Sequence, residues 1–467
     1  MRYVSTRGQA PETDFTGVLL AGLAPDGGLY MPCNWPRLTP ETLRSWRGLP
    51  YPVLVAKVMA LFTAGCLSEA ELLPLCQRAY AGFTHPAITP LVQLRTNLYA
   101  LELFHGPTLA FKDLALQLVG QLFEHILTAR GERVCIIGAT SGDTGSAAIA
   151  ATVGRANLDI VILHPEGKTS EVQRRQMTTV QADNVLNIAL AGNFDDCQDV
   201  VKAMFADAPF RQQMRLSAVN SINFARIIAQ IPYYVYAALN LGAPERELAV
   251  AVPTGNFGNV LAAWAARQMG LPIAKFIVAS NRNDILTRFL NANDMSQRGV
   301  EPSLSPSMDI GISSNFERLL YAFLGHDPVA TARLMQDFRH SGRMAVPQAV
   351  WQAIAAVFTG YRLDDEATLA EIKRFYQDSG YVADPHSVIG FAAGRDCAPP
   401  GMAVVAAATA HPAKFPETIA RAIGLHPPLP PHLADLYEKQ ETYMRSLASL
   451  HPVEALVRNF VNRTKNG

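Results

Sequence analysis

The chain has 467 residues, of which 49% are hydrophobic, and its 40 basic side chains balance its 40 acidic ones. A chain of this length is expected to fold into two or three domains. The balanced charge gives no indication of a nucleic-acid or acidic-membrane partner. The amino-terminal residues lack the apolar stretch of a secretory signal, and no apolar run approaches the roughly 20 residues of a membrane span. The six scattered cysteines show neither CxxC pairs nor metal-ligand spacing, so we expect a reducing, cytoplasmic environment and no metal.

The first part of the chain has a mixed pattern. Turn residues, among them Asp26-Gly27-Gly28, come first, and residues 41–82 then carry apolar side chains at helical spacing. The run Thr84-His85-Pro86 indicates a boundary. We therefore expect a mostly helical N-terminal segment over residues 1–90.

The middle of the chain alternates short apolar runs with amphipathic stretches. Strands that are apolar on both faces and separated by helices form parallel sheets with helices on both sides. The pattern predicts an α/β fold with two parallel-sheet lobes, at about 100–235 and 240–425, within a catalytic region 91–467 that ends in a helical tail. The predicted strands are 133–139, 159–163, 248–252, 274–279 and 402–407.

Lys112 is the first candidate for chemistry. It follows Leu109, Ala110 and Phe111, and burial among such apolar neighbours favours the neutral amine. A neutral amine can form a Schiff base with an aldehyde cofactor. A single lysine in such a run is more often a surface residue at the start of a helix. Two polar turns further along the chain favour a cofactor-binding lysine here.

Each of these turns follows a predicted strand and precedes a helix. In the first, Thr140–Ser146, backbone N–H groups and the helix dipole attract an anion such as a carboxylate or phosphate. In the second, two glycines allow a phosphate to approach the backbone closely. Ordinary helix capping explains one such turn well and two poorly. The second turn consists of Gly255, Asn256, Phe257, Gly258 and Asn259.

Further polar residues stand near strand or helix ends. Thr409 ends a predicted strand, and a hydroxyl beside a pyridine nitrogen leaves that nitrogen largely unprotonated. Arg226 suits a bidentate grip on phosphate or carboxylate, with an interdomain ion pair as the alternative. His386 and His411 precede helices, where proton transfer is possible and capping or a core position is the more frequent role.

In combination, these runs resemble the threonine synthase family, which belongs to the fold-type II enzymes that use pyridoxal 5′-phosphate. The resemblance implies two α/β lobes of the kind found in the tryptophan synthase β subunit. It extends over most of the chain. The matching runs are STRG (5–8), PDGGLYMP (25–32), FHGPTLAFKD (104–113), GATSGDTGSAA (138–148), HPEGK (164–168), QMTT (176–179), NSINFARI (220–227), PTGNFGN (253–259) and TAHPAKF (409–415).

The resemblance implies a role for each candidate. Lys112 would bind the cofactor and transfer protons, the turn 255–259 would bind the cofactor phosphate, and Thr409 would face the pyridine nitrogen. Asp143, where many relatives carry asparagine, would flank the cofactor hydroxyl. Phe224 stands where a tryptophan is frequent, a change expected to alter packing more than chemistry. The substrate would be bound by Thr140, Ser141, Thr144, Asn220, Ser221, Arg226 and Lys414.

The implied activity is the conversion of O-phospho-L-homoserine and water to L-threonine and phosphate, the last step of threonine biosynthesis. The reaction is a γ-elimination followed by addition of water at the β-carbon, carried out by a monomer or homodimer. A related phospho-lyase or dehydratase acting on another amino acid is the first alternative. A relative that binds cofactor or a partner without catalysis is the second.

Overall fold

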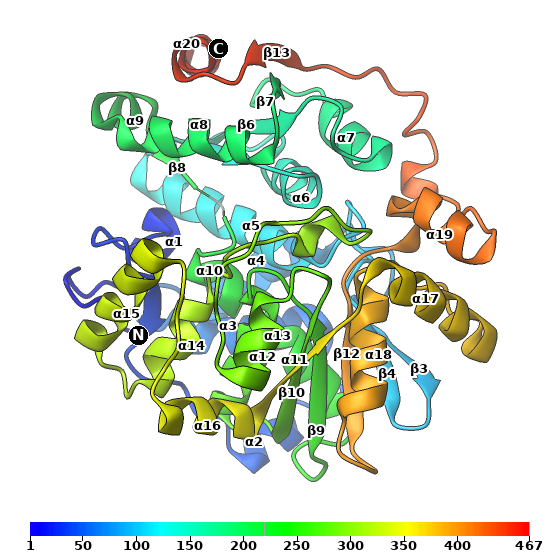
Figure 1. The fold of residues 1–467 in the computed structure, drawn as a ribbon. Helices are drawn as coiled ribbons and strands as arrows, with labels where there is room; N and C mark the ends of the chain where they lie inside the picture. Colours follow the sequence, from blue (N-terminus) through cyan, green and yellow to red (C-terminus); the bar gives the residue numbers. More distant parts are fainter. Residues whose placement is uncertain (219, 467) are drawn as a thin grey trace.

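The computed structural model describes residues 1–218 and 220–466, and side chains as far as residue 464. It contains two large sheets with helices on their faces and a small N-terminal sheet (Figure 1). The predicted α/β fold with two largely parallel-sheet lobes is confirmed. Within the described part of the chain, no helix has the length and apolar character that crossing a membrane requires.

The larger lobe contains six strands in the order β11-β10-β9-β12-β4-β3. All neighbours are parallel except β3 and β4, which form an antiparallel pair at the edge. Val250 and Val252 pack with α12 (Gly258–Met269) on one face of the sheet, whereas Ala249 and Ala251 pack with α18 (Ser387–Cys397) on the other. The strands are β3 (Leu91–Arg95), β4 (Leu98–Glu102), β9 (Leu248–Pro253), β10 (Ile273–Ser280), β11 (Phe358–Arg362) and β12 (Ala403–Ala408).

The smaller lobe contains five parallel strands in the order β13-β7-β6-β5-β8. Its outermost strand, β13, comes from the C-terminal tail. The helix that follows, α20 (Leu450–Asn466), packs on α8 (Phe194–Ala206). Figure 1 shows this tail (red) crossing back from the larger lobe. Sheet membership therefore does not follow chain order, because β3 and β4 precede the smaller lobe and β13 follows the larger one. The strands are β5 (Val134–Ala139), β6 (Leu158–Pro165), β7 (Val185–Ala191), β8 (Leu216–Ser217) and β13 (Met444–Leu447).

The N-terminal segment is mostly helical, as predicted, and it packs on α5 and α11. Ser68 and Glu71 form a capping box that fixes the start of α4. Its elements are β1 (Tyr3–Ser5), α1 (Phe15–Ala21), β2 (Tyr30–Pro32), α2 (Pro40–Ser45), α3 (Tyr51–Phe62) and α4 (Glu69–Tyr80). The helices of the smaller lobe and the connection that follows are α5 (Lys112–Arg130), α6 (Asp143–Thr152), α7 (Glu171–Thr178), α8 (Phe194–Ala206), α9 (Ala208–Met214), α10 (Phe224–Ile228), α11 (Ile231–Asn240) and α20 (Leu450–Asn466). The remaining helices are α12 (Gly258–Met269), α13 (Ile285–Ala292), α14 (Phe316–Phe323), α15 (Pro328–Ser341), α16 (Gln348–Val357), α17 (Asp365–Ser379), α18 (Ser387–Cys397) and α19 (Pro416–Ile423), with short 3-10 helices at Pro306–Met308, Pro412–Lys414 and Pro431–Leu433.

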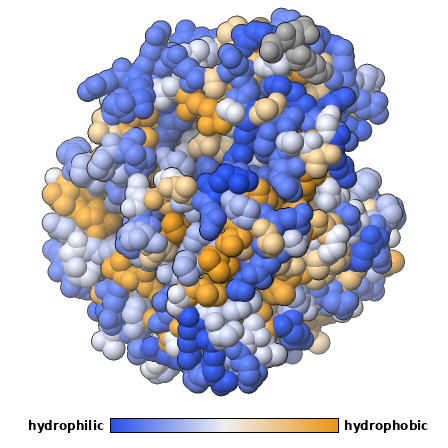
Figure 2. Space-filling view, turned by 180° about the vertical axis from the view of Figure 1, so that it is seen from behind, coloured by the Kyte–Doolittle hydropathy of each residue, from blue (hydrophilic) through white to orange (hydrophobic). Residues whose placement is uncertain are grey.

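Seen from behind, the surface is a mixture of hydrophilic and apolar residues, with the apolar ones in separate patches (Figure 2). The candidate site lies between the two lobes. There the loops at the carboxyl ends of β9 and β12 meet the loop that follows β5. This is the usual position of ligand sites in open α/β sheets.

Candidate active site

Lys112, the first residue of α5, is largely buried between the two lobes. Its Nζ lies 3.2 Å from Asp143 Oδ2 and 3.4 Å from Ser307 Oγ, and it lies over the ring of Phe111. Burial lowers the pKa of Lys112, the carboxylate of Asp143 opposes that effect, and nearby cations add to it. The amine is therefore closer to its neutral, nucleophilic form than a surface lysine is.

Asp143 lies between two buried lysines. Its Oδ1 accepts hydrogen bonds from Lys414 Nζ and Gln173 Nε2, each at 2.8 Å, while its Oδ2 faces Lys112. Burial opposes ionisation of this carboxyl, but the ammonium groups of Lys112 and Lys414 outweigh it and hold the pKa of Asp143 well below its usual value. Asp143 is therefore ionised at neutral pH and supplies the counter-charge for both amines.

The first turn is shaped by its own side chains. Thr140 Oγ1 accepts hydrogen bonds from the N–H groups of Gly142 and Gly145, both at 2.9 Å, so this hydroxyl holds the turn. Ser141 and Thr144 are half-buried, and no described residue hydrogen-bonds either hydroxyl. These two groups, at the N-terminus of the ten-residue helix α6, are the ones available to a ligand.

The second turn, residues 255–258, has its carbonyl oxygens engaged. Asn256 O accepts from the backbone N–H and Nδ2 of Asn315, at 3.2 and 2.9 Å, and Gly255 O accepts from Ser313 Oγ. Phe257 adopts a positive φ of 62°, which turns the chain into α12. Within the described ranges, no protein group accepts from the N–H groups of residues 255–258. The turn therefore offers free donors at a helix N-terminus, the arrangement that binds phosphate.

Asn259 differs from the rest of that turn. Its Oδ1 accepts hydrogen bonds from the hydroxyls of Tyr233 and Tyr234 on α11. The amide oxygen of Asn259 is therefore engaged by α11, whereas its Nδ2 is buried without a hydrogen-bond partner among the described residues.

The run 220–226 lies beside this turn. Asn315 Nδ2 donates to both Ser221 O and Asn256 O, at 3.1 and 2.9 Å, and so ties the two loops together. Asn220 is exposed and its Oδ1 accepts from a nearby backbone N–H. Arg226 is almost fully buried, and burial lowers its pKa to about 10, so it remains charged at neutral pH. Its positive charge is close enough to Lys112 to help lower the pKa of that amine.

Thr409 lies directly against the lysine loop. Its carbonyl accepts from the N–H of Phe111 at 2.9 Å, and its N–H donates to Ser387 Oγ at 2.8 Å. No described residue hydrogen-bonds the Thr409 hydroxyl. Lys414 is fully buried, and its Nζ donates to Thr108 O at 2.8 Å in addition to Asp143.

His411 has the structural role that the sequence left open. Its Nδ1 accepts from Ala413 N–H, which caps a short 3-10 helix, and burial lowers its pKa to about 4. The ring faces Phe104 and a cavity of about 370 Å³ that Glu102 and His105 also line. His411 therefore lines this cavity, and Lys112 does not.

Two residues at this site, Ser307 and Gln173, were not assigned to it from the sequence. His386 was left between proton transfer and a capping or core role. Ser307 stands in a stretch without helical or strand periodicity, so the sequence carried no signal for it. His386 did carry a signal, since Asp384-Pro385-His386-Ser387 precedes a helix.

Comparison with known proteins agrees with this geometry. Three family models match the chain: "Threonine synthase N terminus" over residues 2–80, "Pyridoxal-phosphate dependent enzyme" over 83–409 and "Threonine synthase, C-terminal" over 387–457. A threonine synthase of Pseudomonas aeruginosa is 53% identical, with 100% of each chain covered. The chain belongs to the threonine synthase family.

Solved structures of this family superpose closely on the chain. The pyridoxal phosphate-bound threonine synthase from Brucella melitensis is 48% identical, with a TM-score of 0.97 and 99% of each chain covered. The yeast threonine synthase is 36% identical, with a TM-score of 0.92. The superposition covers 100% of this chain and 99% of the yeast chain. The resemblance seen in the sequence, the fold class and pyridoxal phosphate as the cofactor are thereby confirmed.

Proposed function

We propose that this threonine synthase family member converts O-phospho-L-homoserine and water to L-threonine and phosphate, the last step of threonine biosynthesis. One observation carries the proposal: a buried lysine amine, a helix start with two available hydroxyls (Ser141 and Thr144) and a buried arginine lie together between the lobes. A phosphorylated amino acid needs all three, because it carries an amine to exchange, a carboxylate to orient and a phosphate to grip.

The residues present fit pyridoxal phosphate. Lys112 offers the amine, the free N–H groups of residues 255–258 and the backbone of Asn259 suit the cofactor phosphate, and the Thr409 hydroxyl suits the ring nitrogen. Asp143 suits a position beside the ring hydroxyl. When bound, the cofactor supplies an electron sink for negative charge that develops on the substrate carbons.

The substrate groups have matching sites. We assign the carboxylate to the start of α6, where Ser141 and Thr144 have available hydroxyls and Thr140 holds the turn. We assign the phosphate to Arg226, together with Asn220 and Ser221. The Nζ of Lys414 is already bonded to Asp143 and to the carbonyl of Thr108. Lys414 therefore contributes its positive charge from behind Asp143. Such preorganised charges stabilise phosphate as it leaves.

Lys112 performs the proton transfers. Once the substrate amine has taken its place on the cofactor, the released Nζ takes the α-proton, and Asp143 keeps the amine in place. A β-proton then leaves, phosphate departs from the γ-carbon, and a proton returns there. Water adds at the β-carbon to give the threonine hydroxyl, and a proton returns to the α-carbon. Each transfer requires an amine that can be both neutral and charged, which the lowered pKa of Lys112 favours.

The same proposal describes a cytoplasmic enzyme that acts on a small molecule as a monomer or homodimer, without a nucleic-acid partner. Supporting it, the six cysteines, all in the described part of the chain, form no disulfide.

The direct test is turnover by the purified, cofactor-loaded protein with O-phospho-L-homoserine. We expect equimolar phosphate and threonine, and loss of both in Lys112→Ala. Phosphate accompanied by a keto acid would instead indicate a related eliminase, and absence of turnover in a correctly loaded protein would contradict the proposal.

A further inference from the structure

A segment of the larger lobe, residues 301–309, runs across the site and brings Ser307 to the reactive amine. Ser307 Oγ lies 3.4 Å from Lys112 Nζ and 3.2 Å from Asp143 Oδ2. The hydroxyl has one proton, which it donates to the carboxylate, so its oxygen is left to accept from the amine. Ser307 Oγ thus contacts both the amine and its counter-ion, which also contact each other at 3.2 Å.

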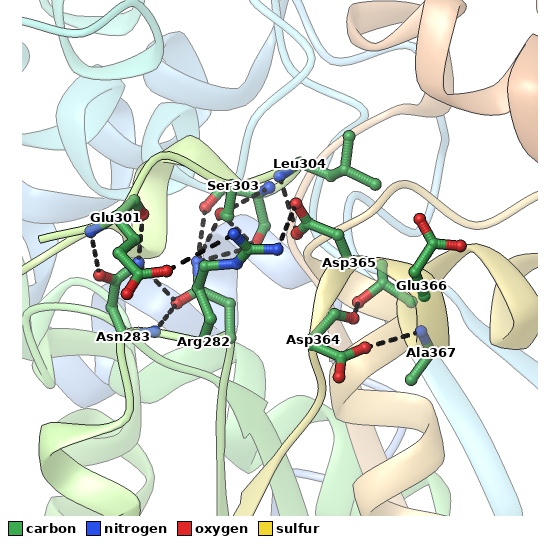
Figure 3. A network of polar contacts seen from close by, with 12 residues as sticks. Arg282, Asn283, Glu301, Ser303, Leu304, Asp364, Asp365, Glu366 and Ala367 are labelled. Carbon is green, nitrogen blue, oxygen red and sulfur yellow. Dashed lines mark hydrogen bonds and ion pairs between the residues drawn. The ribbon is translucent and has the colours of Figure 1, made fainter.

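Polar contacts hold segment 301–309 rigidly although most of it is irregular (Figure 3). Asn283, after β10, exchanges two hydrogen bonds of 2.8 Å with the backbone of Glu301. Asp365, at the start of α17, accepts from Leu304 N–H at 3.2 Å and pairs with Arg282 at 3.0 Å. Hydrogen bonds of this kind restrict the loop, and a side chain on a restrained loop is held closer to one position.

Asn281 and Asp309 bind the middle of the segment. Asn281 Nδ2 donates to Ser303 Oγ at 2.7 Å and to Asp309 Oδ1 at 2.8 Å, and Ser303 Oγ also donates to Asp309 Oδ1 at 2.6 Å. The Ser303 side chain therefore hydrogen-bonds residues that hold the segment, and it does not contact the Lys112 amine. It provides a matched control for Ser307.

A second anchor comes from the loop before α18. His386 Nε2 accepts from the backbone N–H of Ser307 at 3.2 Å, so this ring nitrogen carries no proton. His386 Nδ1 lies 2.9 Å from Asp384 Oδ1 and therefore carries the proton that it donates to the carboxylate. Both side chains are almost fully buried. The Asp384 carboxylate thus fixes one tautomer of His386, and that tautomer accepts from Ser307.

We propose that Ser307 is a positioning residue for the Lys112 amine, and that Asp384 and His386 act through it by fixing its backbone. The inference rests on the proposed function only in taking Lys112 as the cofactor lysine. It assigns the Asp384–His386 pair to holding the amine rather than to moving substrate protons.

The test compares Ser307→Ala with Ser303→Ala in the cofactor-loaded protein. We expect Ser307→Ala to lower kcat about tenfold, the effect of losing one hydrogen bond at the reacting amine. KM should change less than about twofold, because Ser307 is assigned no substrate contact. Ser303→Ala should leave kcat within about twofold of the wild type, since its hydroxyl stays remote from the amine.

A spectroscopic measurement separates this inference from the proposed function. The visible absorbance of the bound cofactor is titrated with pH in the resting protein, without substrate. Ser307→Ala should lower the midpoint by about half a unit, because the hydroxyl oxygen stabilises the protonated form of the Lys112 nitrogen. This shift is expected even if the protein acts on a different substrate. An unchanged midpoint in Ser307→Ala, or an equal shift in Ser303→Ala, would overturn the proposal.

His386 supplies an independent pair of variants. In His386→Gln the amide oxygen can replace Nε2 as acceptor, so the midpoint should stay near that of the wild type. His386→Leu removes the acceptor and should shift the midpoint as Ser307→Ala does. Equal midpoints for the Leu and Gln variants would show that His386 does not act through the Ser307 N–H, and would refute its assigned role.

Discussion

The carboxylate of Asp143 separates two buried ammonium groups, and Asp143→Asn tests how far the structure depends on its charge. The substitution keeps the side-chain shape but removes the charge that lies 3.2 Å from Lys112 Nζ and 2.8 Å from Lys414 Nζ. Removing one partner of a buried ion pair costs about 3–5 kcal/mol. The entropy of unfolding for a chain of this length is about 1 kcal/mol/K, so we expect Tm to fall by about 3–5 °C.

The assay is thermal unfolding, followed by circular dichroism, of the cofactor-free protein, in which both amines are unmodified. Because the folded-state pKa of Asp143 is depressed, its stabilisation is present above the ordinary carboxyl pKa and is lost as pH falls below about 4. The difference in Tm between the wild type and Asp143→Asn should therefore have its full size at pH 7 and become smaller as the pH falls. Adding Lys414→Met to Asp143→Asn should recover part of the loss, because it removes an unpaired buried charge. Equal melting of Asp143→Asn and the wild type at pH 7 would refute the reasoning.

Three further predictions concern other parts of the site. Arg226→Ala should raise KM for O-phospho-L-homoserine by about 100-fold, since losing one partner of a buried charged contact costs about 2–5 kcal/mol; steady-state kinetics showing an unchanged KM would remove the residue from the phosphate site. Gly255→Ala should weaken cofactor binding in a spectrophotometric titration, because the new Cβ would lie 2.9 Å from Ser307 O, whereas Gly299→Ala, with open space around it, should bind normally. Equal affinities for these two variants would contradict the close approach. Burial raises the pKa of Asp113 to about 6, so its protonation stabilises the folded protein at low pH and that stabilisation is lost as pH rises from about 4 to 6. Urea unfolding should show the wild type losing about 3 kcal/mol relative to Asp113→Asn over this interval, and parallel pH profiles would argue against the assignment.

Local patterns in the sequence were sufficient to predict the central strands and the loop that carries Lys112. The runs that became β5, β6, β9, β10 and β12 were mostly apolar, so their burial on both faces was predictable. Lys112 and Thr409 stood out for the same reason, since each lies next to an apolar run that fixes its place at a strand or helix end. Asn259 shows the limit of that reasoning: the turn was recognised, but the rotation of α12 directs its amide oxygen to two tyrosine hydroxyls.

Contacts between distant segments were not predictable. Strand β13 is a short, largely exposed run whose pairing with β7 depends on a tail that returns from the other lobe. Ser307 is held by hydrogen bonds to Asn281 and Asp365 through the segment around it, and to His386 nearly 80 positions further along the chain. A single sequence contains no period or motif that reports such contacts. The contact of Ser307 with the reactive amine therefore became visible only in the folded chain.

Isotope labelling of the products tests the proposed chemistry most directly. The cofactor-loaded protein is incubated with O-phospho-L-homoserine in water enriched in oxygen-18, and phosphate and amino acid are analysed by mass spectrometry. Elimination breaks the bond between the γ-carbon and oxygen, and water then adds at the β-carbon. We therefore predict threonine with one oxygen-18 atom and phosphate with none. Labelled phosphate together with unlabelled homoserine would mean simple hydrolysis of the ester, and would contradict the account.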